Sequence, residues 1–212
     1  MPLTPREHDR KYGELDHVIR AHLGRTADEV EPLTAYLRHT WRTRPWAVPI
    51  AEEQLRAYAD NPPGRLRLRL GEFYPVPDVG LPDSEIQAWL ARLADRLEES
   101  VESGQAPPPA TPQTRWEWHA RFPELAQFLG GWFSQDMPDE FEDHDAALED
   151  YLTSTDSGLI AQLTGELHDL LTPPLDESDY ALAVAVGMEV DPPAPYAPGA
   201  WLVALAERLR TP

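Results

Sequence analysis

The 212-residue chain has no cysteine, only one lysine (Lys11) and no long apolar run. Without cysteine there can be no disulfide framework, thiol nucleophile or thiolate metal site. Nowhere do about 18 apolar residues follow one another, as a membrane-spanning helix requires. The N-terminal residues also lack the apolar stretch of a signal peptide. These absences predict a soluble protein of the cytoplasm.

Positive charge is scarce as well. The chain has 18 Lys and Arg residues against 37 Asp and Glu, a formal net charge of -19. Non-specific binding to nucleic acid or to an anionic membrane needs a basic surface, so neither is expected. Residues 1–106 carry 14 basic and 18 acidic residues, whereas residues 107–212 carry 4 and 19. The acidic excess therefore lies in the second half, and a basic protein is the expected partner.

Sequence motifs of common enzymes are missing too. The nucleotide-binding patterns GxGxxG and GxxxxGK[ST], the hydrolase pattern GxSxG and the zinc pattern HExxH do not occur. His17 and His22 are five residues apart, which places them on different faces of a helix. We therefore expect no cofactor and no metal, and a binding protein rather than an enzyme.

Apolar residues recur with helical spacing along both halves, which predicts an all-α, mostly helical fold. A proline-rich stretch, GQAPPPATPQT, interrupts the pattern at residues 104–114 and is typical of a linker. We expect an N-terminal helical domain at 1–103, this linker, and a C-terminal helical domain at 115–212. RLRLRL at 65–70 alternates strictly and could form a short strand.

Four helices are predicted in the first domain. Leu15, Val18, Ile19 and His22 share one face of the first. Thr26 and Glu29 form a capping-box pattern that would open the second. The third covers residues 51–59, and the fourth runs from about residue 83 to a C-terminal cap at Gly104.

Five helices are predicted in the second domain. Pro123 suits the first turn of the first helix. Asp143 and Asp156 are placed to cap the next two. The last two cover residues 180–186 and 201–209. About 90 residues would then form a small orthogonal or bundle-like helical domain.

The two halves share two short matches. Tyr12-Gly13-Glu14-Leu15 parallels Phe122-Pro123-Glu124-Leu125, and Trp89-Leu90 parallels Trp201-Leu202. The matches are separated by 77 residues in the first half and 79 in the second. Either the chain is a diverged tandem duplication, or two helical segments resemble each other by chance.

Tryptophan positions allow further predictions. Trp89 and Trp201 fall on apolar stripes and should lie in the core. Trp116 and Trp118 are expected to cover the edge of the second domain. Trp132 follows Gly130-Gly131 and precedes a run of carboxylates, where a half-exposed tryptophan would suit the centre of an interface.

An acidic cluster follows Trp132: Asp136, Asp139, Glu140, Glu142, Asp143 and Asp145, beside His144. It could be a solvated face, a partner-binding surface, or a metal or catalytic site. The EF-hand pattern fails because the stretch has no glycine and contains a proline. A carboxylate- or metal-dependent hydrolase using His144 is one alternative, and an acidic adaptor or phosphate-mimicking regulator of a basic protein is another. Gln135-Asp136 could instead brace the following helix.

One stretch carries a family resemblance. FPELAQFLGGWFSQD, the acidic residues after it, GELHDLL at 165–171 and AWLVALAERL at 200–209 together resemble the immunity proteins of contact-dependent growth inhibition. The resemblance covers about residues 116–212. Two positions depart from the family pattern: Ser134 stands where histidine is usual, and Met137 stands where an aromatic is expected.

The resemblance implies a protein that binds the toxic C-terminal domain of a cognate polymorphic toxin in the cytoplasm and blocks its active site or its access to substrate. Many such toxins are nucleases, whose substrate channels are basic. The residues expected to contact the toxin are Trp132, Asp136, Asp139, Glu140, Glu142 and Asp143.

Overall fold

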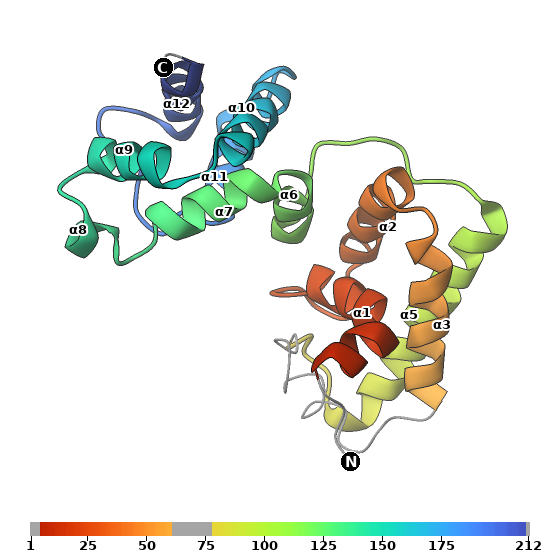
Figure 1. The fold of residues 1–212 in the computed structure, drawn as a ribbon. Coiled ribbons are helices and arrows are strands. Elements are labelled where there is room, and N and C mark those ends of the chain that lie inside the picture. Colours follow the sequence, from red (N-terminus) through yellow and green to blue (C-terminus); the bar gives the residue numbers. More distant parts are fainter. Residues whose placement is uncertain (1–4, 61–77, 211–212) are drawn as a thin grey trace. The chain divides into compact units, whose positions relative to one another are not determined.

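A computed structural model describes residues 5–60 and 78–210, and its ribbon is drawn in Figure 1. The described residues form eleven helices and no strand, which confirms the all-α prediction. The strand considered at 65–70 lies outside the described residues. Among the described helices, none is both long and apolar enough to cross a membrane. The chain divides into two compact units, residues 1–117 and 118–212.

Four helices build the first unit: α1 (Pro5–Ala21), α2 (Glu31–Thr43), α3 (Ala47–Asp60) and α5 (Asp83–Ser103). α1 packs against α2 and α3, and α3 runs beside α5 (Figure 1). The predicted apolar face of α1 is buried, since Leu15, Val18, Ile19 and His22 are each at most 3% exposed. Gly104 ends α5 in a left-handed conformation (φ 61°), as its position predicts.

The start of α2 differs from its prediction. The Glu29 carboxylate does accept a hydrogen bond from the backbone N–H of Thr26 at 2.8 Å, which is half of a capping box. Residues 27–30 are nevertheless not helical, and α2 begins at Glu31 with Pro32 in its first turn. Proline is favoured there because a first-turn N–H has no partner within the helix. The Thr26–Glu29 pair therefore closes a turn before the helix.

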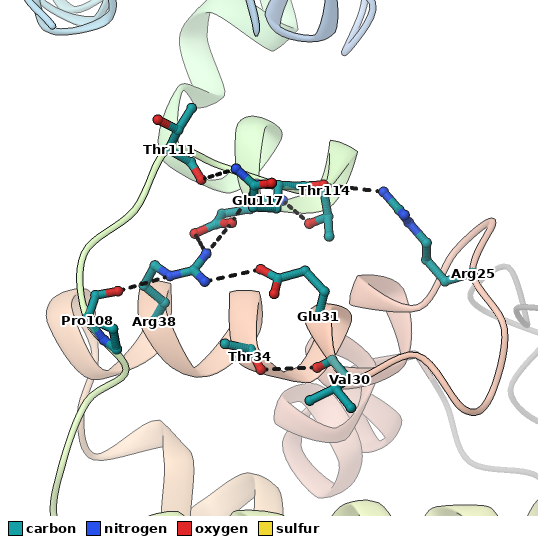
Figure 2. A network of polar contacts seen from close by, with 10 residues as sticks. Arg25, Val30, Glu31, Thr34, Arg38, Pro108, Thr111, Thr114 and Glu117 are labelled. Atoms are coloured by element: carbon teal, nitrogen blue, oxygen red, sulfur yellow. Dashed lines mark hydrogen bonds and ion pairs between the residues drawn. The ribbon is translucent and has the colours of Figure 1, made fainter. Parts of the chain in front are cut away.

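The proline-rich segment is held against α2 (Figure 2). The Arg38 guanidinium donates to both carboxylate oxygens of Glu117 at 2.8 Å and to the carbonyl oxygen of Pro108 at 3.2 Å. It also donates to Glu31 at 3.1 Å. The Glu117 side chain is only 5% exposed, so this is a nearly buried ion pair. These residues all belong to the first unit.

Trp116 and Trp118 lie on one short helix, α6 (Arg115–Arg121), but they enter different cores. Trp116 packs against Tyr36 and His39 of the first unit, with ring centroids 5.8 and 5.7 Å apart. Trp118 is 1% exposed and belongs to the core of the second unit. The expectation that both cover the edge of the second unit was therefore wrong for Trp116.

The rest of the second unit consists of α7 (Pro123–Trp132), α8 (Met137–Glu140), α9 (His144–Ser154), α10 (Ser157–Leu171), α11 (Glu177–Val184) and α12 (Pro198–Arg210). Pro123 opens α7 as predicted. Asp143 caps α9 through the N–H of Ala146 at 2.8 Å, and Asp156 caps α10 through the N–H of Gly158 at 2.7 Å. The short helices α6 and α8 were not predicted. α7 packs on α9 and α10, and α12 packs on α10 and α11.

Candidate functional site

Residues 133–143, the acidic connection, join α7 to α9. Two apolar side chains hold it to the core of the second unit: Met137 is 4% exposed, and Phe141 is partly buried against the same cluster. The N–H of Phe141 donates to the carbonyl oxygen of Met137 at 2.9 Å and closes the single turn of α8. The connection therefore has a defined conformation although most of its side chains are polar.

Its carboxylates all face solvent. Asp136, Asp139, Glu140, Glu142 and Asp143 are each exposed. Within the described residues, no basic side chain forms an ion pair with any of the five. Their charges are thus not neutralised inside the unit and act outward.

Two of these carboxylates have a clear structural context. Asp143 caps α9 with one oxygen, which fixes its backbone and leaves its charge at the surface. Asp136 precedes α8, but its side chain accepts no capping hydrogen bond. The bracing considered for Gln135-Asp136 is made by the backbone: the N–H of Gln135 donates to Glu189 at 3.2 Å, and the N–H of Asp136 donates to the Ser134 hydroxyl at 3.3 Å.

Trp132, the residue directly before the acidic connection, is half-buried. Its ring lies 4.8 Å from Tyr151 in an edge-on arrangement and 6.4 Å from Phe128. Its indole N–H donates to Asp150 on α9 at 3.0 Å. Only part of the ring is therefore free to contact a partner. Sequence reasoning missed Asp150, because nothing local relates positions 18 residues apart on different helices.

Contacts outside the acidic cluster hold the His144 side chain. Its Nε2 donates to the backbone carbonyl of Asp191 at 2.9 Å, and its ring lies against Phe133 at 5.7 Å. Both contacts orient the side chain at the start of α9. No group of three or more His, Asp or Glu side chains in the described ranges is arranged to hold a metal ion.

One carboxyl group of the second unit has a raised pKa, and it lies away from the connection. Burial raises the pKa of Glu166 on α10, although the hydrogen bonds that it accepts from the N–H groups of Leu125 and Glu124 lower it. Those distances are 2.9 and 3.3 Å. Glu166 therefore satisfies the free N–H groups at the start of α7, a structural role.

A cavity of about 650 Å³ opens between α9, α12 and residues 193–196. Phe133 and Trp201 line it together with Tyr196, and Asp143 and Asp145 contribute carboxylates. Arg208 lines it too and pairs with Asp145 at 3.2 Å and with Glu149 at 2.8 Å. Arg208 thus partly neutralises the carboxylates of α9, whereas no basic side chain of the described residues pairs with those of the acidic connection.

The charge of the second unit completes the description of the site. Residues 118–212 contain three basic and 18 acidic residues, an excess of 15 negative charges.

Comparison with family models gives a match over this unit. Residues 121–209 match the CdiI immunity protein family. The match includes α7 to α9, the acidic connection and most of α12, and it confirms the family resemblance seen in the sequence.

A CdiI immunity protein neutralises a toxin, so the match indicates a toxin-neutralising role for the second unit. It covers less than half of the chain and leaves the first unit without an assignment. No curated protein and no solved structure matched the chain.

Proposed function

We propose that the protein neutralises a cognate toxin by forming a stoichiometric complex with its toxic domain, and that this domain is a basic nuclease. The observation that carries the proposal is the coincidence of the CdiI family match with the strongly negative second unit. A nuclease must hold phosphates, so its substrate channel is positively charged. A negatively charged protein surface is complementary to such a channel.

The proposed contact face consists of Trp132, Asp136, Asp139, Glu140, Glu142 and Asp143. Three properties of these residues support the choice. The five carboxylates are exposed and unpaired among the described residues. Met137 and Phe141 anchor their connection, so little conformational entropy is lost when it binds. Trp132 offers an aromatic surface beside them, and tryptophan is enriched among interface residues that dominate affinity.

The charges should act chiefly on the rate of association. Complementary fields raise association rate constants by roughly 10- to 1,000-fold and can bring them to about 10⁸–10⁹ M⁻¹s⁻¹ at low salt. Rapid capture is what a cell needs when the free partner is lethal. Blocking the substrate channel requires no chemistry by the immunity protein itself.

A charge-matched pair of variants tests the face. The first variant changes Asp136, Asp139 and Asp143 to Asn and Glu140 and Glu142 to Gln; Asn at position 143 can still cap α9. The control neutralises five exposed carboxylates of the first unit, Glu53, Asp60, Glu85, Glu99 and Glu102. Both variants change the net charge equally.

Association with the toxin domain encoded beside this protein is then followed by stopped-flow fluorescence over a range of salt concentrations. The first variant should associate at least about tenfold more slowly at low salt, with a weaker salt dependence, and should lose growth rescue on co-expression with the toxin. The control should change the rate by less than about threefold. Equal effects of the two variants would place the contact elsewhere, and a chain that never binds the toxin would end the proposal.

A further inference from the structure

Both units contain a side chain that accepts hydrogen bonds from two adjacent backbone N–H groups, at the start of α7 in the second unit and within α1 in the first. In the second unit, the Glu166 carboxylate on α10 accepts hydrogen bonds from the N–H groups of Glu124 and Leu125. In the first unit, the side-chain oxygen of Gln54 on α3 accepts from the N–H groups of Glu14 and Leu15, both at 3.0 Å. The two donors are 110 positions apart in the sequence, and the two acceptors are 112 positions apart.

An aromatic contact repeats in the same way. His22, just after α1, meets Trp89 of α5 edge-on, with centroids 5.2 Å apart. Phe133, just after α7, meets Trp201 of α12 edge-on at 5.4 Å. The two tryptophans are again 112 positions apart.

Buried positions follow the same spacing on two pairs of helices. On α3 and α10 the buried residues 112 positions apart are Ala51 and Leu163, Leu55 and Leu167, and Tyr58 and Leu170. On α5 and α12 they are Leu90 and Leu202, Leu93 and Leu205, and Ala94 and Ala206. Helical periodicity explains agreement within one helix, but it does not explain why separate helices keep one common spacing.

The pairs of helices in contact also correspond. α1 packs on α2 and α3, and α3 packs on α5; α7 packs on α9 and α10, and α10 packs on α12. We infer that the first unit is a second, diverged copy of the immunity module, with the same helix framework and a contact connection that recognises a different protein surface.

The change of spacing from 110 to 112 matches a difference in length between two connections. The connection from α1 to α2, residues 22–30, has nine residues, and the connection from α7 to α9, residues 133–143, has eleven. The longer connection contains all five carboxylates of the proposed contact face. The framework is therefore shared, and the difference in length falls in the part proposed to meet the toxin.

The charge of the two connections differs as well. In the first unit, residues 22–31 contain Arg25 with Asp28, Glu29 and Glu31, and Arg25 pairs with Glu29 at 3.3 Å. Leu23 and Val30 are 43% and 51% exposed beside them. The counterpart in the second unit, residues 132–143, has five acidic residues and no basic one. The first connection thus suits a protein surface of mixed charge with apolar patches, whereas the second suits a basic one.

Exchange of the equivalent residues in the full chain tests the shared framework. Glu166→Gln and Gln54→Glu each install the residue of the other copy and should change the melting temperature by less than about 4 °C. Glu166→Leu and Gln54→Leu each remove the side-chain acceptor of two N–H groups and should each lower it by about 5 °C or more. Exchanges that destabilise as much as the leucine variants would overturn the equivalence.

The inference that the two copies bind different partners rests on the proposed function, and a separate binding experiment tests it. Leu23→Ser combined with Val30→Ser should leave the affinity for the basic toxin domain within about twofold, and native mass spectrometry should find one toxin domain per chain. A tenfold loss of affinity, or two toxin domains per chain, would show that both copies take the same partner. If the chain binds no toxin domain, the proposed function fails, while the exchange variants still decide the duplication.

Discussion

Replacing Arg38 by methionine should strongly destabilise the first unit. The substitution removes both 2.8 Å contacts with Glu117 and leaves that carboxylate, 5% exposed, with the N–H of Gln113 at 3.0 Å. Removing one partner of a buried ion pair costs about 3–5 kcal/mol, because the other charge stays desolvated. The Pro108 carbonyl also loses its donor. At about 4 °C per kcal/mol, the unit should melt roughly 10–20 °C lower.

Thermal and urea unfolding, followed by circular dichroism and tryptophan fluorescence, measure this change. Arg42→Met is the matched control, because Arg42 lies on the same helix with its side chain exposed; it should stay within about 0.5 kcal/mol of the parent. Adding Glu117→Met to Arg38→Met should recover part of the loss, since no charge then remains buried. The reasoning fails if Arg38→Met behaves like the control, or if the double variant is less stable than Arg38→Met alone.

Two further predictions concern one residue in each unit. Burial lowers the pKa of His22, although the hydrogen bond with the Val18 carbonyl and the charge of Glu29 raise it. As the pH falls, the imidazole of the unfolded chain takes up a proton near pH 6.5, before the imidazole of the folded chain does. The stability of the first unit should therefore fall from pH 7 to pH 5. Burial also lowers the pKa of His17, so His17 adds to this loss of stability. Urea unfolding at several pH values should show that the free energy of unfolding of His22→Phe falls less steeply between pH 7 and pH 5. An unchanged dependence on pH contradicts the assignment to His22. A Cβ at Gly187 would lie 2.5 Å from the Ala126 carbonyl oxygen and 2.8 Å from the Gly130 nitrogen, so Gly187→Ala should cost about 1–3 kcal/mol of unfolding free energy. Gly165→Ala on α10, where the added Cβ meets nothing within 4 Å, should be neutral or stabilising; equal losses would refute the close approach.

Local rules predicted the helices that depend on local chemistry. Pro123, Gly104, Asp143 and Asp156 each act within one turn of a helix, and all four lie where their residue types suggested. The start of α2 was misplaced because the Thr26–Glu29 pattern is satisfied equally well by an isolated turn. A capping box indicates which N–H groups are satisfied, but not whether the helix continues from there.

Contacts between distant residues were out of reach from one sequence. The acceptors Gln54 and Glu166 lie about 40 residues from the N–H groups that they satisfy. Trp116 could not be assigned to a core, because two residues along one short helix point to different sides. The four sequence anchors Leu15, Leu125, Trp89 and Trp201 all lie in the cores. Their meaning required the partners that the fold supplies.

Within the proposed contact face, we expect two separate contributions to binding. The five carboxylates are exposed on an anchored connection, so their field acts before contact and should set the association rate. The indole N–H of Trp132 already donates to Asp150, and its ring is braced by Tyr151 and Phe128. Trp132 can therefore contribute its ring surface without ordering a free side chain, and it should slow dissociation. Removing the carboxylates and truncating Trp132 should thus change different rate constants of the same complex, which a model based on net charge alone does not predict.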